Sequence, residues 1–448
     1  MSYPGYGNQA YGQQYPPQGG AYGQPYPPHQ QQSPYPPQQG HYPPPQGQYP
    51  PQGYPPGPPP GHAPYGHSPA PPQGYGHPPP GQYGAPPPPS PYGQPPPPHA
   101  GYGAPPPAPY GAPPPHQPAG PPVQPTPPSI GYGAPQIIPW DGAPDANAAR
   151  QAMKGFGTDE KALIRALATR DPLQIAAIRD AFKRLHNRNL EADIRSETSS
   201  WFEKGLIAIV RGPLHHDVFS IRDAVDGPGT KEKILNDVLL GRSNADIRAI
   251  KGAYFSTFRR SMEDDVRSDL SMKTKRHFDI VMGASRAEDA APVIPQQVDQ
   301  DVMDLYRAGE AKLGTDEMIF CSILSTRNDN QIRAIAYAYE QKFRKNLEDV
   351  IKSEFSGHME DALLYQLRNA ADKYMHAAKL LEDSMKGMGT KDHLLVGRVV
   401  RYHWDAGYLA NVKGAYQQKY GRSLASRISG ETSGDYRRLM LACIGEPI

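Results

Sequence analysis

The chain has 448 residues, of which 46 are Lys or Arg and 44 are Asp or Glu, so its formal net charge is only +2 at pH 7. This small charge excludes a polybasic surface that could by itself hold the protein on nucleic acid or on an anionic bilayer. The two cysteines have no accompanying Cys/His cluster, which excludes a disulfide framework and a structural zinc site.

The composition changes sharply at Trp140. Only seven of the 57 prolines follow this residue, and residues 1–139 contain no charged residue and no Leu, Phe or Trp. Such a segment buries too little apolar surface to offset the conformational entropy lost on folding. We therefore predict a disordered Pro/Gly/Tyr/Gln-rich tail over 1–139 and a globular part over 140–448.

The chain shows no signal for secretion or for insertion into a membrane. Its first residues lack the basic and apolar regions of a signal peptide, and no stretch approaches the roughly 18–20 apolar residues of a membrane span. We therefore expect a cytoplasmic protein that is soluble when synthesised.

A fourfold repeat organises residues 140–448. Four loops end in Gly-Thr, and their last glycines lie 72, 85 and 75 residues apart. Within each copy the apolar residues keep helical spacing, as in Ile175, Ile178 and Phe182. We predict an all-α protein of four similar units, with the loops Met153–Thr158, Val225–Thr230, Lys312–Thr315 and Met385–Thr390.

The loops also punctuate the helices. A glycine that can adopt a left-handed conformation ends one helix, and Thr158, Thr230, Thr315 or Thr390 can N-cap the next. Pro292 and Pro295 interrupt the helical pattern between the second and third units. The expected organisation is repeat 1 over 140–211, repeat 2 over 212–283, a linker over 284–297, repeat 3 over 298–371 and repeat 4 over 372–448.

Each loop has features of a cation site. A glycine-rich turn after a helix exposes carbonyls that the helix leaves unpaired, at the negative end of the helix dipole. Calcium prefers six to eight oxygen ligands, commonly with a carboxylate among them. An acid lies 40 residues after the last loop glycine in the first three repeats, at Glu197, Asp269 and Glu354. In repeat 4 the acid is Glu431, two residues later, which indicates a short insertion between loop and acid.

A single Gly-x-Gly-Thr loop is more often only a helix cap followed by a new helix start. Four copies with registered acids favour calcium instead. The loops lack the spacing of a phosphate-binding loop, and the EF-hand pattern does not occur in the chain. No catalytic arrangement recurs among the repeats, so the sequence predicts no enzyme.

The loop motif with its distant acid, repeated four times, closely resembles the annexins, as does the ending Gly430–Tyr436. The tail is similar in composition to those of the long-tailed annexins, such as annexins VII and XI and fungal annexins. This resemblance implies five helices in each repeat and a curved disc with the calcium loops on its convex face.

The resemblance also implies a set of calcium ligands in each repeat. They are the carbonyls of Met153, Gly155 and Gly157 with Glu197; of Val225, Gly227 and Gly229 with Asp269; of Gly309, Lys312 and Gly314 with Glu354; and of Met385, Gly387 and Gly389 with Glu431. Asp226 and Pro228 depart from the usual pattern of the family, but carbonyl donors need no particular side chain. In repeat 4 the two inserted residues are expected to loop out.

Three carbonyls and one carboxylate supply about five oxygens, so one or two positions stay open to an external ligand such as a lipid phosphate. The expected function is calcium-dependent, peripheral binding to acidic phospholipid membranes, with a further role in bridging or organising vesicles. The variable loop residues are apolar, and Phe156, Leu313 and Met388 are candidates for contact with the lipid interface. The alternative is that they pack back on their own helices.

The tail suggests a second class of function. Its 17 tyrosines and repeated Tyr-Pro-Pro motifs are typical of self-association or of ligands for Pro-reading modules. The resemblance to long-tailed annexins also implies penta-EF-hand partners. A tail-driven scaffold or condensate protein, with the repeats as its membrane anchor, is therefore the alternative reading, while no specific nucleic acid is predicted.

Overall fold

The computed structural model describes residues 123–311 and 314–447. Residues 1–122, which hold most of the predicted disordered tail and all of its Tyr-Pro-Pro motifs, lie outside the described residues. The predictions of tail self-association and of tail partners therefore concern a part of the chain on which the structure does not bear.

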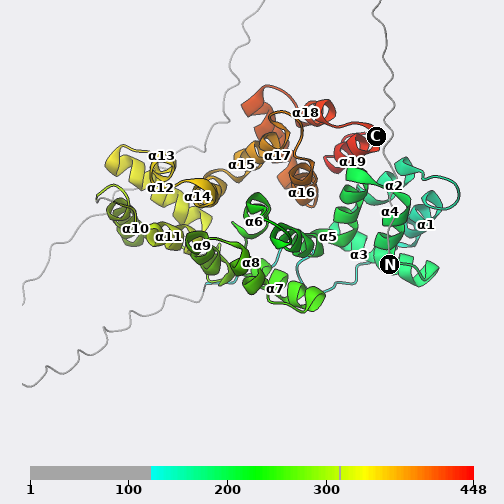
Figure 1. Ribbon diagram of the computed structural model, residues 1–448, viewed down its shortest axis with the longest axis horizontal. Helices are drawn as coiled ribbons and strands as arrows, with labels where there is room; N and C mark the ends of the chain where they lie inside the picture. The colour runs from blue at the N-terminus through cyan, green and yellow to red at the C-terminus, as the bar shows by residue number, and fades with distance from the viewer. Residues whose placement is uncertain (1–122, 312–313, 448) are drawn as a thin grey trace, which may run out of the picture. The chain divides into compact units, whose positions relative to one another are not determined.

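The described residues form 19 α-helices and no strand (Figure 1). A break inside α5 at Gly212, where φ is +69° and ψ is 173°, divides this helix in two just before Pro213. With α5 divided there, each of the four repeats has five helices, and the predicted all-α class of four similar units is confirmed. The helices of the first half are α1 (Ala143–Ala152), α2 (Glu160–Leu167), α3 (Pro172–His186), α4 (Leu190–Glu197), α5 (Ser200–Val225), α6 (Glu232–Leu239), α7 (Asn244–Phe258), α8 (Met262–Asp269) and α9 (Met272–Met282).

The second half repeats the same order after an irregular stretch that begins at Gly283. Pro295 occupies the first position of α10, where its fixed φ and missing N–H are tolerated. The helices are α10 (Pro295–Ala308), α11 (Glu317–Thr326), α12 (Asp329–Phe343), α13 (Leu347–Glu354), α14 (Gly357–Ala371), α15 (Lys373–Met385), α16 (Asp392–His403), α17 (Ala406–Tyr420), α18 (Leu424–Glu431) and α19 (Gly434–Cys443).

Local capping explains why the third helix of each repeat has the same length, 15 residues. Each begins after a short polar N-cap whose side chain accepts a backbone N–H, and each ends at a residue in the left-handed conformation. The N-caps are Asp171, Ser243, Asn328 and Asp405, and the left-handed ends are Asn187, Arg259, Arg344 and Gly421.

The two residues inserted in repeat 4 do not loop out as expected. They lengthen the second helix of that repeat, because α16 has 12 residues where α2 and α6 have eight and α11 has ten. A helix absorbs the insertion while satisfying its own backbone hydrogen bonds, so the distance between loop and acid is kept without an exposed bulge.

The third helix of each repeat supplies the aromatic centre of a hydrophobic core. Phe182, Tyr254, Tyr339 and Tyr416 are completely buried at equivalent positions. The cores of repeats 1 and 4 form one continuous cluster, whereas repeats 2 and 3 each have their own. The first and last repeats are thus joined by shared apolar burial, the main source of stability in such bundles.

Arginines hold the first helix to the end of the second in three repeats. Arg170 pairs with Asp145 at 2.6 Å, and Arg327 pairs with Asp301 at the same distance. Arg242 pairs at 2.5 Å with Asp217, which also binds Arg401 of repeat 4 at 2.6 Å. Equivalent hydrogen bonds inside the bundle are thus made by Arg170, Arg242 and Arg327.

Residues 123–139 differ from the expectation of a tail that is disordered up to residue 139. Tyr132 is buried, and its hydroxyl donates to the Asp217 carboxylate, while Ser129 donates to both oxygens of Asp246. The backbone N–H of Thr126 donates to Glu288 at 2.7 Å. These partners lie 85 or more residues away, so composition alone could not reveal them.

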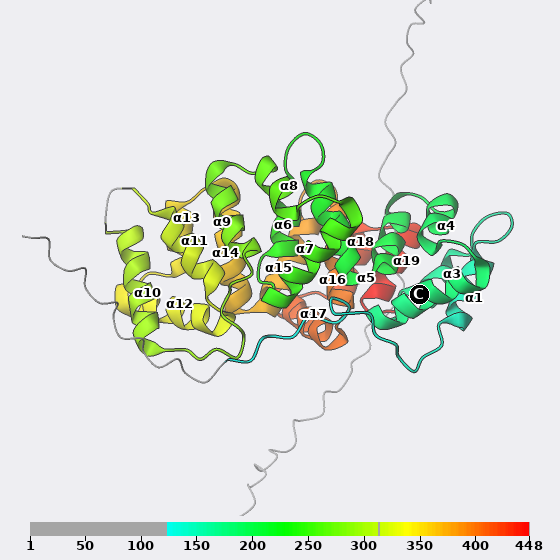
Figure 2. The same ribbon diagram turned by 90° about the horizontal axis from the view of Figure 1, so that it is seen from below.

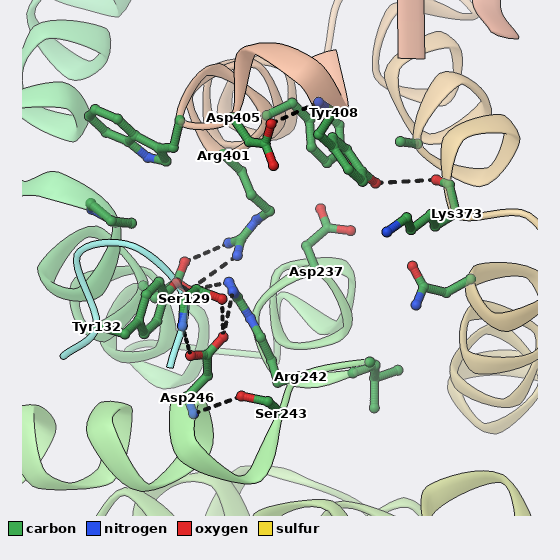
Figure 3. Close-up of a pocket in the computed structure, with 18 of the residues that line it drawn as sticks. Ser129, Tyr132, Asp237, Arg242, Ser243, Asp246, Lys373, Arg401, Asp405 and Tyr408 are labelled. Carbon is green, nitrogen blue, oxygen red and sulfur yellow. Dashed lines mark hydrogen bonds and ion pairs between the residues drawn. The ribbon is translucent and has the colours of Figure 1, made fainter. Parts of the chain in front are cut away.

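The same segment borders a cavity of about 580 Å³ that is lined by residues of repeats 2, 3 and 4, and Tyr132, Arg242 and Arg401 converge there (Figure 3). Burial and the neighbouring Asp217 raise the pKa of Tyr132 above its ordinary value, although Arg242 and Arg401 oppose this rise. In Figure 2 the segment runs in cyan along the lower edge, whereas the loop after α5 projects from the upper edge and the loop after α1 from the right-hand end. Among the described residues, no helix is both long and apolar enough to cross a membrane.

Candidate metal sites in the four loops

The loop between the first and second helices is closed in the same way in every repeat. The backbone N–H of the residue after the loop threonine donates to a carbonyl at the end of the first helix. The four bonds are Asp159 to Ala152 at 2.9 Å, Lys231 to Ala224 at 2.9 Å, Asp316 to Ala308 at 2.8 Å and Lys391 to Ser384 at 2.8 Å. This bond gives a common register for comparing the repeats.

Two glycines set the backbone of the loops in repeats 1, 2 and 4. Their φ angles are +111° and +80° at Gly155 and Gly157, and the corresponding pairs in repeats 2 and 4 agree to within 10°. A Cβ at either position would meet no atom within 4 Å, so these positions need glycine for the backbone angle and not for space. The conformation is thus a shared property of the three loops.

In repeats 1, 2 and 4 the first residue of the loop anchors it to the core. Met153 and Met385 are buried in the cluster shared by repeats 1 and 4, and Val225 packs against the core of repeat 2. The next residues turn away into solvent. Phe156 and Met388 are fully exposed, so neither packs back on its own helices, while Leu313 and Lys312 lie outside the described residues.

The loop threonines connect each loop to the fourth helix of its repeat. In repeats 1 and 2, Thr158 Oγ1 donates to the Glu197 carbonyl at 2.9 Å and Thr230 Oγ1 to the Asp269 carbonyl at 2.8 Å. In repeat 3, Thr315 Oγ1 donates to Glu354 Oε2 at 2.5 Å. The prediction that the threonines N-cap the second helix was wrong, since the N-cap is the following residue.

Thr390 makes the corresponding contacts in repeat 4, to the Glu431 carbonyl at 3.3 Å and to Glu431 Oε2 at 3.0 Å. The structure therefore brings each predicted acid to its own loop, including Glu431 despite the insertion. The recurrence of Thr in all four loops was the sequence signal for this contact, which sequence reasoning assigned to capping.

The acids of repeats 1 and 2 are placed to accept a cation. Glu197 is exposed and makes no hydrogen bond or ion pair through its carboxylate to any residue in the described part of the chain. Asp269 Oδ2 is buried without a hydrogen-bond partner among the described residues. A buried oxygen of this kind carries a free-energy penalty until a cation or donor reaches it. This unpartnered oxygen is the observation that best fits a calcium ligand.

The loop of repeat 3 is one residue longer between its closing groups. Gly309, the first predicted carbonyl donor there, is buried, and its N–H caps α10 by donating to Leu305. Gly314 has a φ of +88°, which matches the last glycine of the other loops. Within 123–311 and 314–447 no group of three or more His, Cys, Asp or Glu side chains could hold a metal ion. Each loop instead has a single predicted acid beside it, which its threonine contacts.

Repeat 4 differs from the others at its carboxylate. The Arg427 guanidinium donates both to Glu431 Oε1 and to the carbonyl of Met385, two of the predicted calcium ligands. Arg427 also donates to Glu382 at 3.2 Å. Sequence reasoning missed this residue, although it lies one helical turn before Glu431, where repeats 1 and 2 have Asp193 and Asp265.

Four five-helix repeats with glycine loops and distant acids define the class of protein, and comparison with known families agrees. The sequence profile of the annexin family matches residues 144–209, 216–277, 300–365 and 376–443. Annexin C1 of Cryptococcus neoformans var. grubii is 40% identical over 304 residues, which are 67% of this chain and 64% of that protein. Annexin A7 of Homo sapiens is 39% identical over 303 residues, 67% of this chain and 61% of that protein.

These matches span less than two thirds of the length of the two relatives. Among solved structures, annexin III superposes with a TM-score of 0.66 at 30% identity, covering 71% of this chain and 100% of that one. Calcium-bound annexin (Sm)1 superposes with a TM-score of 0.61 at 26% identity, covering 73% and 94%.

The chain thus belongs to the annexin family. Annexins are non-enzymatic proteins that bind calcium and membrane phospholipids.

Proposed function

We propose that this protein binds acidic phospholipid membranes in a calcium-dependent manner, through the loops of its repeats. The observation that best supports this proposal concerns Asp269. Its buried Oδ2 has no hydrogen-bond partner among the described residues, and its main-chain carbonyl accepts a hydrogen bond from Thr230 of the loop. Membership of the annexin family supports the same function, as does the solved relative that is described as calcium-bound.

The proposed ion in repeat 2 is held by Asp269 and by the carbonyls of Val225, Gly227 and Gly229. The Glu197 site of repeat 1 and the Glu354 site of repeat 3 use the equivalent donors. Because calcium prefers six to eight oxygens, each such site keeps room for a lipid phosphate oxygen. Lipid and calcium then complete each other's coordination, so each strengthens the binding of the other.

The exposed loop residues add an apolar contact in this proposal. Phe156 and Met388 are fully exposed, and burying such a side chain in the lipid interface stabilises attachment by about 1.5–3 kcal/mol at most. Leu313 is proposed for the same role in repeat 3. Several loops on one protein then combine through their effective concentration at the membrane.

The test is co-sedimentation of the full chain with phosphatidylserine or phosphatidylcholine vesicles, in calcium or in chelator. We expect pelleting only with phosphatidylserine and calcium together. The double variant Glu197→Gln with Asp269→Asn should need about tenfold more calcium or greater for half-maximal binding, since two of the cooperating sites are lost. Glu340→Gln on α12 is the matched control, because this exposed carboxylate makes no ion pair among the described residues.

Binding to phosphatidylserine that persists in chelator would contradict the proposed calcium requirement. Equal binding by the double variant and by the control would show that the loop acids are not the ligands. Bridging or organising vesicles would be a further activity of the protein, and it is measured separately by the turbidity of a vesicle suspension. Deleting residues 1–122 tests the tail-driven alternative, because scaffold or condensate activity should disappear while calcium-dependent pelleting remains.

A further inference from the structure

An ion pair between the first and fourth helices is reversed in repeat 4. In repeats 1 and 2 the cation lies on the first helix and the acid on the fourth, with Arg150 to Asp193 at 3.6 Å and Arg222 to Asp265 at 3.1 Å. In repeat 4 the acid Glu382 lies on the first helix and the cation Arg427 on the fourth, at 3.2 Å.

The closing bond of each loop shows that these positions correspond. Arg150, Arg222 and Glu382 each lie two residues before the carbonyl that closes the loop. Asp193, Asp265 and Arg427 each lie four residues before the loop acid. Repeat 3 has the buried, apolar Val350 at this second position. Repeat 4 is therefore the repeat in which a positive side chain stands one helical turn from the loop acid.

The reversal places a cation among the proposed calcium ligands. Arg427 is only 14% exposed in its side chain, and its guanidinium donates to Glu431, to the Met385 carbonyl and to Glu382. An arginine guanidinium keeps its charge at every pH at which the protein is folded. The side chain thus stays positive, with donors directed at the oxygens that calcium needs.

Calcium and this guanidinium compete for the same oxygens. An incoming ion must break the Arg427 bonds to Glu431 and to Met385, and it meets a like charge at short range in a partly buried place. The Asp269 site of repeat 2 imposes no such cost, because its buried oxygen has no partner among the described residues.

We propose that Arg427 closes the fourth loop to calcium by occupying the ligand positions itself, so that the protein binds calcium through repeats 1 to 3. This inference rests on the proposed calcium function of the other loops, and it differs from the expectation that Met385 and Glu431 hold an ion in the wild-type protein.

The test is the calcium stoichiometry of the full chain, measured by equilibrium dialysis with radioactive calcium at a concentration that saturates the wild type. Arg427→Met keeps an unbranched side chain but removes the charge and the donors, while Glu382 keeps Tyr416 and Arg422 as partners. We expect this variant to bind one more calcium ion per chain than the wild type. Adding Glu431→Gln should abolish the gain, whereas Glu431→Gln alone should leave the wild-type stoichiometry unchanged.

Arg422→Gln is the matched control, because Arg422 pairs with Glu382 at 3.3 Å and makes no hydrogen bond or ion pair with Met385 or Glu431. Near-ultraviolet circular dichroism in chelator checks folding, and Arg427→Gln replaces the Met variant if that variant is unfolded. A wild type that loses an ion on Glu431→Gln overturns the inference, as does a folded Arg427→Met variant that gains none. The calcium stoichiometry of Asp269→Asn is measured in parallel. If this variant loses no calcium ion relative to the wild type, the proposed calcium function itself is contradicted.

Discussion

Replacing Asp269 with Asn separates a calcium ligand from a structural acid. The Thr230 hydroxyl bonds to the main-chain carbonyl of Asp269, so this link between loop and helix survives the substitution. The change acts on the carboxylate alone, whose Oδ2 is buried without a partner in the described structure. In chelator we therefore expect the free energy of unfolding to stay the same or to rise by up to about 1 kcal/mol, since a carboxylate with one buried, unpartnered oxygen is removed.

In calcium the same substitution should be costly. A ligand at 100 times its dissociation constant stabilises the folded state by about 2.7 kcal/mol for one site. Asp269→Asn should lose about that amount of calcium-dependent stabilisation. The assay is urea unfolding followed by circular dichroism, in calcium and in chelator.

The control for this experiment is Asp264→Asn on the same helix. The Asp264 side chain is 75% exposed and lies 3.5 Å from Arg267, so its loss should change stability little in either condition. If Asp269→Asn destabilises the protein equally with and without calcium, the carboxylate has a structural role and the reasoning is refuted.

Three further outcomes are expected. Phe156→Ser should weaken calcium-dependent vesicle binding about fivefold without changing the melting temperature, because the side chain is fully exposed in the free protein. Met388→Ser should weaken this binding less, unless Arg427 is also replaced. Unchanged vesicle affinity of both variants in co-sedimentation would exclude a lipid contact. Tyr132→Phe removes the hydroxyl that donates to Asp217. It should lower the free energy of unfolding by only about 1 kcal/mol in urea titrations, since the arginines still pair with that carboxylate. An unchanged free energy of unfolding would mean that the hydrogen bond from Tyr132 to Asp217 contributes nothing to stability. Burial first, and then neighbouring cations, lower the pKa of His376 to about 3. The folded state therefore binds this proton more weakly than the unfolded state, and the free energy of unfolding should fall as the pH drops below about 6.5. His376→Leu should reduce that fall by about 1.4 kcal/mol per pH unit, and parallel pH profiles for variant and wild type would contradict this assignment.

The local pattern of the sequence was sufficient for the fold class and for the register of the sites. Helical periodicity and capping residues act over a few positions, so the helices around Phe182 or after Asp171 could be predicted from nearby residues alone. The fourfold repetition added a second level of information. It predicted that Glu197 and Asp269 lie beside loops about 40 residues earlier, and the threonine contacts place them there.

What the tertiary structure decided depends on partners that are distant in sequence. Tyr132 belongs by composition to a disordered tail, yet it is buried because Asp217, Arg242 and Arg401 from two repeats surround its ring and hydroxyl. Arg427 is an ordinary helix residue in the sequence, and only the packing of α18 against the fourth loop directs its guanidinium at Met385. Sequence periodicity reports which face of a helix is buried, but the identity of a charge partner is set by how the helices are packed together.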